Sequence, residues 1–279
     1  MDWLEALRRS RTDGRDAVLV TVVTVRGHAP RDAGAKMVVT AEDCHDSIGG
    51  GNLEATAVGR AREILAAGSR APETMEMTLN ERVTTRHGRQ CCGGVVTVLL
   101  EPLPARPTVA IFGAGHVGLE LGRILARHPL ALRLVDSRPG QVRAAQALAG
   151  QVADVRADHA PAPETVLAAL PGGAHVYVMT HDHAEDMVLC DAALRRGDLG
   201  TVGLIGSSAK WARFRKRLVE GGHEPAAVDT VTCPIGLPAL VGKSPAVIAV
   251  SVAADLLLRL EADAAPAGPH DVGDLAVLP

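Results

Sequence analysis

Val109-Ala110-Ile111-Phe112-Gly113-Ala114-Gly115-His116-Val117-Gly118 is the stretch of this chain with the clearest structural signature. An unbroken apolar run, typical of a buried strand, leads into three glycines with the spacing of a dinucleotide-binding turn. In such a turn the first glycine permits a sharp change of direction, the second lets a pyrophosphate approach the backbone, and the third lets the next helix pack closely on the strand. The stretch therefore predicts a strand, a glycine turn and a helix whose N-terminus favours an anion.

Strand and helix patterns alternate after this turn. Apolar runs predict further strands at residues 132–136, 176–180 and 202–205. Helices are expected after Gly118, after Pro139, up to Arg196, over residues 208–219, and from Pro245, with Ser244 as its cap, to about Leu260. Alternation of this kind is typical of a parallel sheet with helices on both faces. We therefore expect an α/β fold with a Rossmann-like, doubly wound C-terminal domain.

The part of the chain before this domain has its own pattern of elements. Strands are expected at residues 17–25, 36–40 and 95–100, and helices at residues 4–9 and 53–66. The segment 102–107 holds three prolines, which fit neither a helix interior nor a central strand. We place a boundary there, with a separate N-terminal α/β domain over residues 1–104, the Rossmann-like domain over 105–263 and a flexible tail over 264–279.

Composition narrows the class of protein. With 279 residues, 47% of them hydrophobic, the chain is long enough for two cores. Its formal net charge of -3 gives no general attraction to nucleic acid. No segment predicts a membrane span, and the N-terminus lacks the layout of a secretory signal. The five cysteines have no repeated spacing and predict no disulfide framework. We expect a soluble cytoplasmic protein.

The glycine turn of the C-terminal domain is a candidate nucleotide site. The residues expected at the phosphates are Gly113, Gly115, His116 and Gly118. Asp136, at the end of the second strand, would meet the ribose hydroxyls of a bound nucleotide. An acidic residue there favours NAD because it repels a 2′-phosphate, whereas the neighbouring Arg138 works against that preference. The alternative is that the turn serves packing alone, with no nucleotide bound.

A cluster of possible metal ligands follows the strand that ends at residue 180. His181 and His183, with Asp186, stand at the edge where open α/β sheets bind ligands. Two imidazoles and a carboxylate can hold Zn²⁺ or another transition metal. The alternative is a polar loop in which Asp182 or His183 caps the next helix.

A third candidate begins the helix after the next strand. Ser207 and Lys210 combine a hydroxyl, a cation and the free amide groups of a helix start, which together predict an anion site. The alternative is an ordinary serine cap followed by a solvated basic face.

Two glycine-containing loops mark the N-terminal domain. Cys91-Cys92-Gly93-Gly94 precedes a strand, and its glycines would let a ligand or another backbone come close. Basic residues just upstream could lower the pKa of a thiol, which predicts a reactive or ligand-binding cysteine; the alternative is a small buried residue beside a tight turn. Gly49-Gly50-Gly51 begins a helix whose end could receive a phosphate, although Glu54 would stabilise the helix dipole without any ligand.

These motifs occur together, in one order, over most of the chain. The N-terminal ones are Pro30-Arg31, Gly34-Ala35-Lys36-Met37, Ser47-Ile48-Gly49-Gly50-Gly51-Asn52-Leu53-Glu54 and Gln90-Cys91-Cys92-Gly93-Gly94. The C-terminal ones are residues 111–118, Met179-Thr180-His181-Asp182-His183, Gly203-Leu204-Ile205-Gly206-Ser207 and Pro234-Ile235-Gly236-Leu237. In this combination, which is far more specific than any single motif, the chain resembles the XdhC family of xanthine dehydrogenase accessory proteins.

The resemblance implies a chaperone for the molybdenum cofactor rather than an enzyme with turnover of its own. Such proteins bind the finished molybdopterin cofactor, hold it while a cysteine desulfurase supplies the terminal sulfido ligand, and pass it to xanthine dehydrogenase. Cys92 matches the family's cysteine before Gly-Gly. The other residues that the resemblance points to are Cys91, Gly50, Gly51, Glu54, Arg31 and Lys36. A homodimer is compatible with the family.

One position departs from the family's pattern. Many relatives, including those linked to carbon monoxide dehydrogenase, have Cys where this chain has Asn52, which argues against a two-cysteine metal site. The C-terminal domain taken alone gives a different hypothesis, an NAD-dependent oxidoreductase in which His181 or His183 moves a proton. That hypothesis leaves the two N-terminal loops without a role. Metal-dependent hydrolysis at His181 and His183 is a third hypothesis.

Overall fold

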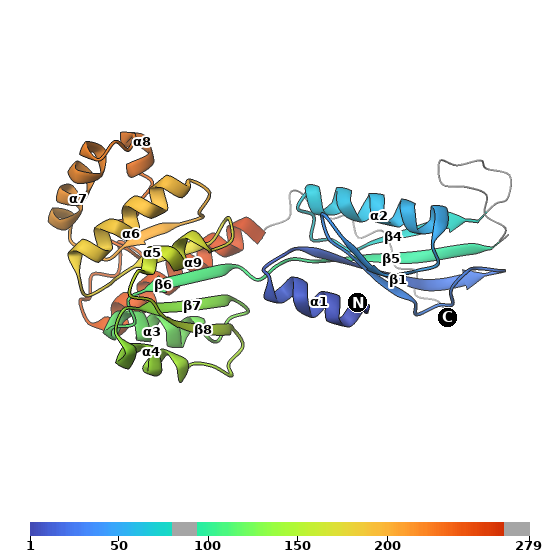
Figure 1. Ribbon diagram of the computed structural model, residues 1–279, viewed down its shortest axis with the longest axis horizontal. Helices are drawn as coiled ribbons and strands as arrows, with labels where there is room; N and C mark the ends of the chain where they lie inside the picture. The colour runs from blue at the N-terminus through green and yellow to red at the C-terminus, as the bar shows by residue number, and fades with distance from the viewer. Residues whose placement is uncertain (80–93, 265–279) are drawn as a thin grey trace. The chain divides into compact units, whose positions relative to one another are not determined.

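The computed structural model describes residues 1–79 and 94–264 (Figure 1). The chain divides into two compact units, one that contains Met1–Ala105 and one that comprises Arg106–Ala265. The boundary lies in the segment with three prolines, one residue after the position that the sequence suggests.

The first unit is built on an antiparallel sheet of five strands. The strands are β1 (Ala17–Arg26), β2 (Lys36–Val39), β3 (Cys44–Asp46), β4 (Glu73–Thr78) and β5 (Val95–Leu103), in the order β3-β2-β1-β5-β4. Helix α2 (Gly51–Ala66) lies along one face and α1 (Trp3–Thr12) along the other (Figure 1). Leu53, Ala57, Ala61 and Ile64 of α2 recur at helical spacing and bury themselves against the sheet.

Strand β1 changes its alternation near its end. Its pairing with β5 shifts register between Val22 and Thr24, which is the signature of a β-bulge. Val22 before the bulge and Val25 after it both contact the core beneath α2. The extra residue therefore lets the valines on both sides of the bulge face the core, although they are three positions apart.

The second unit is a parallel sheet of five strands. These are β6 (Thr108–Phe112), β7 (Ala131–Asp136), β8 (Asp154–His159), β9 (His175–Val178) and β10 (Val202–Leu204), in the order β10-β9-β6-β7-β8. After β8 the chain returns across the sheet to pair β9 with β6, so the strand order reverses between these two strands. This is the order of a Rossmann fold, and the reversal point is where such folds bind ligands.

Helices cover both faces of the parallel sheet, as the sequence predicts. One face carries α3 (His116–Leu125), α4 (Pro139–Gln146) and α9 (Pro245–Ala264). The other carries α5 (Pro163–Ala168), α6 (His183–Arg196), α7 (Ser208–Glu220) and α8 (Pro225–Val228). The prediction of an α/β fold with a doubly wound C-terminal part is confirmed. Among residues 1–79 and 94–264, no helix combines the length and hydropathy that a membrane crossing needs.

Several elements differ from the prediction. The elements that the sequence patterns do not reveal are β3, β4, β8, α5 and α8. Strand β4 lies at the edge of its sheet and alternates half-buried and exposed residues, so it has no continuous apolar run. Helices α5 and α8 are too short to show a helical period. Helix α3 begins at His116 rather than after Gly118, which lies inside its first turn.

Candidate functional site

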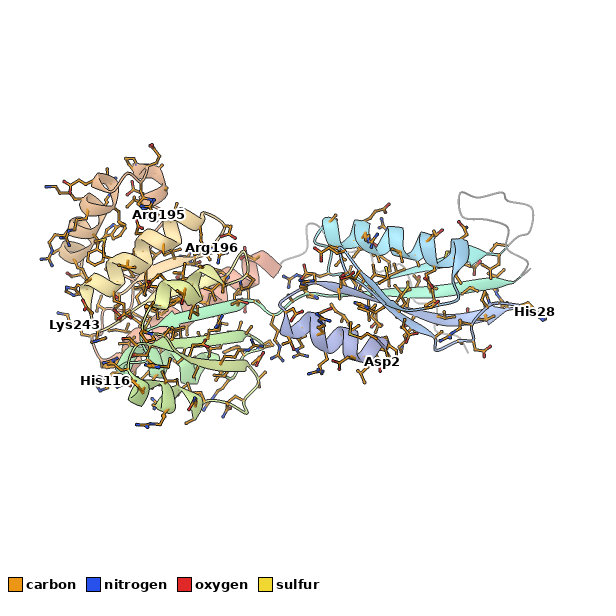
Figure 2. All side chains as sticks on the ribbon, in the orientation of Figure 1. Asp2, His28, His116, Arg195, Arg196 and Lys243 are labelled. Carbon is orange, nitrogen blue, oxygen red and sulfur yellow. The ribbon has the colours of Figure 1, made fainter. Side chains whose placement is uncertain are left out.

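Three motif segments of the first unit meet at one end of its sheet. A Cβ atom added to Gly49 would lie 2.8 Å from the Cβ of Pro30. One added to Gly94 would lie 2.3 Å from the carbonyl oxygen of His28, which stands at the tip of the turn after β1 (Figure 2). These approaches are too close for any side chain, so both positions require glycine. The turn at residues 27–31, the glycine turn before α2 and the glycine before β5 therefore form one assembled region, which we call the glycine end.

The glycine turn before α2 binds the carboxylate of Glu54, a residue of the same helix. Gly49, Gly50 and Gly51 have φ values of 130, 73 and 62°, a left-handed path that side chains other than glycine rarely adopt. The Glu54 carboxylate accepts hydrogen bonds from the Gly50 amide at 3.2 Å and from the Ser47 hydroxyl at 2.5 Å. The geometry thus matches the alternative in which Glu54 stabilises this helix start. Space above Gly50 is open, since a Cβ there would meet no atom within 4 Å.

The two basic residues expected here are placed differently. Arg31 is exposed at the glycine end, with its Cγ 3.6 Å from a Cβ built on Gly49. Lys36 lies on the opposite face of the sheet, where its Nζ donates to Thr21 Oγ1 at 3.0 Å and stands 5.6 Å from the centre of the Trp3 ring. Lys36 is therefore separated from the glycine turn by the sheet itself. Instead of Lys36, the turn that carries Arg31 holds His28, a residue that the sequence patterns do not single out.

The cysteines of this motif lie outside the described residues. Cys91 and Cys92 are part of residues 80–93, whereas Gly94 is described and buried. The third thiol of the unit, Cys44, is exposed on β3.

Alanine at Gly49 should damage the glycine end more than alanine at its neighbour. Gly49→Ala combines a strained φ with a clash against Pro30, so we expect a loss of about 2–3 kcal/mol in the free energy of unfolding of this unit. Gly50→Ala meets no atom, but at φ 73° and ψ -173° it carries the backbone penalty of a region that glycine alone favours, about 1–2 kcal/mol. Urea unfolding of Trp211→Phe proteins, followed by Trp3 fluorescence, measures both. Equal losses for the two variants would contradict the packing described above.

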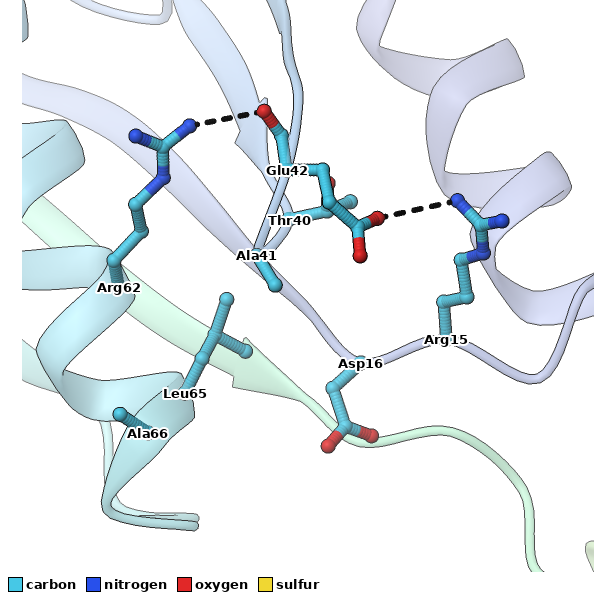
Figure 3. Close-up of a pocket in the computed structure, with 8 residues that line it drawn as sticks. All are labelled: Arg15, Asp16, Thr40, Ala41, Glu42, Arg62, Leu65 and Ala66. Carbon is cyan, nitrogen blue, oxygen red and sulfur yellow. Dashed lines mark hydrogen bonds and ion pairs between the residues drawn. The ribbon is translucent and has the colours of Figure 1, made fainter. Parts of the chain in front are cut away.

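The first unit has a hollow at the C-terminal end of α2, away from the glycine end. It has a volume of about 550 Å³ and is lined by Arg15, Asp16, Thr40, Ala41, Glu42, Arg62, Leu65 and Ala66 (Figure 3). Arg15 contacts the Glu42 carboxylate at 3.4 Å, and Arg62 donates to the Glu42 backbone carbonyl at 3.2 Å. Because two cations face two carboxylates, the hollow has no net attraction for an anion.

In the second unit the first and third glycines of the turn have the packing roles that the spacing predicts. A Cβ on Gly113 would lie 2.3 Å from the carbonyl oxygen of Met179, and one on Gly118 would lie 2.0 Å from that of Gly113. The first glycine thus lets the turn cross the end of β9, and the third lets α3 pack on β6. A Cβ on Gly115 would meet nothing within 4 Å, which leaves that position open to a ligand. His116, beside it, is exposed (Figure 2).

Asp136 braces this turn instead of facing outward. One carboxylate oxygen accepts from the Ala114 amide at 2.8 Å and from Arg138 Nη2 at 2.9 Å, and the other accepts from the amide and Nε of Arg138, both at 2.9 Å. Burial opposes ionisation of this carboxyl, but the hydrogen bonds from Arg138 and Ala114 outweigh it and lower the Asp136 pKa. The side chain is 2% exposed. These contacts occupy both carboxylate oxygens in this structure, and the role of Asp136 toward a ribose diol stays a prediction.

The candidate metal ligand Asp186 and the candidate anion-binding residue Lys210 bind each other. Asp186 is fully buried, and it accepts from Lys210 Nζ at 2.6 Å and from the Thr180 amide and hydroxyl at 3.0 and 2.8 Å. Lys210 also donates to the carbonyl of Ile205 at 2.9 Å. Asp186 is thus committed to an internal ion pair, and within residues 1–79 and 94–264 no three His, Cys, Asp or Glu side chains gather as a metal site.

The helix starts around this pair match the capping alternatives. Asp182 accepts from the Ala184 amide at 2.7 Å at the start of α6, and Ser207 accepts from the Lys210 amide at 3.2 Å at the start of α7. His181 and His183 are exposed, and the His183 ring meets Phe214 edge-on at 6.4 Å.

A carboxyl group that the sequence patterns missed lies at the strand-order reversal. Glu185, in the first turn of α6, accepts a hydrogen bond from the Ser137 hydroxyl at 3.4 Å. Burial raises its pKa, and nearby Asp136 adds to the effect, whereas His181 opposes it. Its only signal in the sequence is its position in the first turn of a helix, where acidic residues are common without any ligand.

The comparisons with known proteins decide the family. Residues 109–256, more than half of the chain, match the family model described as the XdhC Rossmann domain. Residues 10–77 match the model of the XdhC and CoxI family. This chain belongs to the XdhC family. The order of motifs that suggested the XdhC resemblance is therefore confirmed as a family relationship.

Two individual proteins are similar to this XdhC-family chain. The molybdenum cofactor insertion chaperone PaoD of Escherichia coli (strain K12) is 34% identical over 122 residues, which cover 43% of this chain and 34% of PaoD. The match thus spans about a third of the curated relative. A Bacillus halodurans protein described as a xanthine dehydrogenase has a crystal structure with a TM-score of 0.47 and 19% identity, over 96% of this chain and 98% of that one. At these values we draw no functional conclusion from the second likeness.

Proposed function

We propose that this chain is a maturation factor that binds the molybdenum cofactor at its glycine end and inserts it into a molybdoenzyme. The observation that carries the proposal is the packing of Gly49 on Pro30 and of Gly94 on His28, which brings three separate family motifs to one place. Family membership and the similarity to PaoD, itself a molybdenum cofactor insertion chaperone, support the same role.

The groups at the glycine end suit a phosphorylated pterin cofactor. Arg31 is an exposed guanidinium, and guanidinium groups bind phosphate in a bidentate way. The first amide groups of α2 have no acceptor within the helix, and the open space above Gly50 lets an anion reach them. Glu54 would hold the turn in shape through its bond to the Gly50 amide, without occupying the outer side.

The thiol of Cys92 completes this proposal. Cys92 precedes Gly94 by two residues in the sequence, and Gly94 belongs to the glycine end. A thiolate is a soft ligand of the kind that transition metals accept. When bound, the cofactor supplies a molybdenum centre. The chain would hold the cofactor's phosphate at Arg31 and keep the Cys92 thiol beside the metal.

The finer steps rest on the resemblance to the family alone. We propose that the chain holds the cofactor while a cysteine desulfurase supplies the terminal sulfido ligand, and that the acceptor is a xanthine dehydrogenase. The second unit adds no favoured alternative, since Asp136 spends its carboxylate on Ala114 and Arg138 instead of presenting it to a nicotinamide nucleotide.

Retained molybdenum tests the proposal. The full chain is incubated with molybdenum cofactor, free cofactor is removed, and bound molybdenum is measured by mass spectrometry. We expect near-stoichiometric retention by the wild type and a loss of at least about tenfold for Cys92→Ala, since a metal–ligand bond is removed. Cys44→Ala is the matched control, because it removes an exposed thiol of the same unit from a different strand.

Each remaining outcome has a clear meaning. Retention that falls equally in Cys92→Ala and Cys44→Ala would reject the glycine end as the site. No retention by the wild type, together with saturable binding of a reduced nicotinamide cofactor, would replace the chaperone function with an oxidoreductase. Transfer of bound molybdenum to apo-xanthine dehydrogenase, with recovery of its activity, tests the acceptor.

A further inference from the structure

A hollow with a volume of about 440 Å³ lies between α6 and α7, on one face of the parallel sheet (Figure 1). The start of α6 borders it with His183 and Ala184. Phe214 of α7 lies beside them, and its ring meets that of His183 edge-on. The cofactor site proposed above belongs to the first unit, so it leaves this hollow without a role. Three cationic side chains of α7 complete the lining and give the basic hollow its name: Arg213, Lys216 and Arg217.

The cations of the basic hollow are available to a partner. Arg213 and Arg217 are exposed, stand one helical turn apart, and form no ion pair or side-chain hydrogen bond with any residue that the structure describes. Lys216 has a single distant partner, the Glu220 carboxylate at 3.7 Å. Among the described lining residues, one carboxylate thus stands against three cations. The hollow is a local positive region in a chain whose formal net charge is -3.

An exposed apolar side chain borders the basic hollow. Val188 is 48% exposed and follows Ala184 by one helical turn, so the two residues lie on the same side of α6. A single exposed valine is ordinary on a protein surface. Next to unpaired arginines it gives the combination of apolar and guanidinium groups that protein interfaces favour.

The basic hollow lacks the features of a site for a small anion. At the start of α6 the Asp182 carboxylate already accepts from the Ala184 amide at 2.7 Å, so its negative charge would repel an anion from this helix end. The two arginines are long side chains that no described hydrogen bond fixes, whereas specific phosphate sites hold their donors in place. The cations are therefore suited to several negative charges spread along a larger partner.

We propose that the basic hollow is a docking surface for an acidic amphipathic helix of another protein. Carboxylates one turn apart on that helix would meet Arg213 and Arg217, which have the same spacing on α7. An apolar side chain of the helix would cover Val188. A helix can lie along these groups and avoid Asp182 and Glu220 at the borders of the hollow, whereas a flat anionic membrane would press against both carboxylates. The proposal is independent of the cofactor site, which lies in the first unit.

Fluorescence anisotropy with a synthetic peptide tests the docking surface on the full chain. The probe is a labelled helical peptide of about 20 residues, long enough to form a helix, with glutamates one turn apart on one side and leucines on the adjoining side. We expect a dissociation constant of about 10–100 µM, in the range of small interfaces. The affinity should fall about threefold or more between low and physiological salt, because the ion pairs are exposed. A peptide of the same composition in scrambled order should bind about fivefold more weakly or worse.

Variants of α7 and α6 locate the contact. Arg213→Gln combined with Arg217→Gln should weaken peptide binding about fivefold or more, since two ion pairs are lost. Arg215→Gln is the matched control: it removes the same charge from the same helix, but Arg215 is already paired with Asp229 at 2.6 Å. We expect the affinity of this control to stay within about twofold of the wild type. Val188→Ser should weaken binding about threefold, because apolar contact is lost. Circular dichroism checks that each variant folds.

Four results would overturn the proposal. The first is no saturable binding of the helical peptide up to about 1 mM. The second is a double variant that binds no more weakly than Arg215→Gln. Inorganic pyrophosphate that binds more tightly than the peptide, with loss of binding in the double variant, would instead make the hollow a small-anion site. Phosphatidylserine vesicles that sediment the wild type but not the double variant would make it a membrane contact.

Discussion

Lys210→Met should lower the free energy of unfolding of the second unit by about 3–5 kcal/mol, the usual loss when one partner of a buried ion pair is removed. The variant leaves the fully buried Asp186 carboxylate without its cation, and it removes a donor from the Ile205 carbonyl. Met keeps the stem volume near Phe214, so packing changes little. Urea unfolding in a Trp3→Phe background measures the loss, because Trp211 is then the only tryptophan of the chain and lies on α7 beside the substituted residue.

Two further variants isolate the cause. Arg215 lies on α7 like Lys210, and Arg215→Met breaks its exposed ion pair with Asp229 at the end of α8. We expect the unfolding midpoint of this variant to be nearly unchanged. Asp186→Asn combined with Lys210→Met removes both charges but keeps an acceptor for the Thr180 amide, so it should recover a large part of the loss. A double variant as unstable as Lys210→Met alone would show that packing, not charge, explains the result.

Gly113→Ala should cost the second unit at least about 3 kcal/mol, since strain and overpacking add at one position. Gly113 has φ 109°, and its Cβ would lie 2.3 Å from the Met179 carbonyl oxygen and 2.8 Å from the Cα of Thr180. Both neighbours are backbone atoms, so the ends of β6 and β9 must move apart. The same unfolding experiment on the Trp3→Phe protein gives the magnitude.

Gly115→Ala is the control from the same turn. Its φ is -77° and its Cβ would meet no atom within 4 Å, so we expect stability within about 1 kcal/mol of the wild type. An equal loss for Gly113→Ala and Gly115→Ala would contradict the close approach of this turn to β9. Because Gly115→Ala keeps the fold while filling the open position, it also separates packing from ligand binding at this turn.

Local rules predicted much of the second unit. The glycine spacing from Gly113 to Gly118 specified both the turn and the tight packing of α3, because a Cβ at either end of the pattern would overlap backbone. Alternating strands and helices predicted the parallel sheet. The structure adds the order of the strands, which depends on how the chain returns after β8, an element without an apolar run.

Contacts between distant residues were beyond the sequence patterns. Asp186 and Lys210 are 24 positions apart and each looked like a ligand for something else; only the packing of α7 beside α6 shows that they satisfy each other. Asp136 was expected to face a ribose, yet its partner Arg138 lies two residues away and turns it inward. Lys36 was grouped with Arg31, but the alternation of β2 places it on the other face of the sheet.

The bulge in β1 lets the first unit absorb a change in chain length. Val23 is the extra residue, because Val22 pairs with Val98 and Thr24 pairs with the next residue of β5, Thr97. Deleting Val23 would restore a regular ladder in which Val25 still pairs with Val96 and still faces the core beneath α2. The turn that follows β1 would therefore begin from the same face of the sheet. Because Val23 is also 46% exposed, related chains that share this site should vary at the bulge both in side chain and in length.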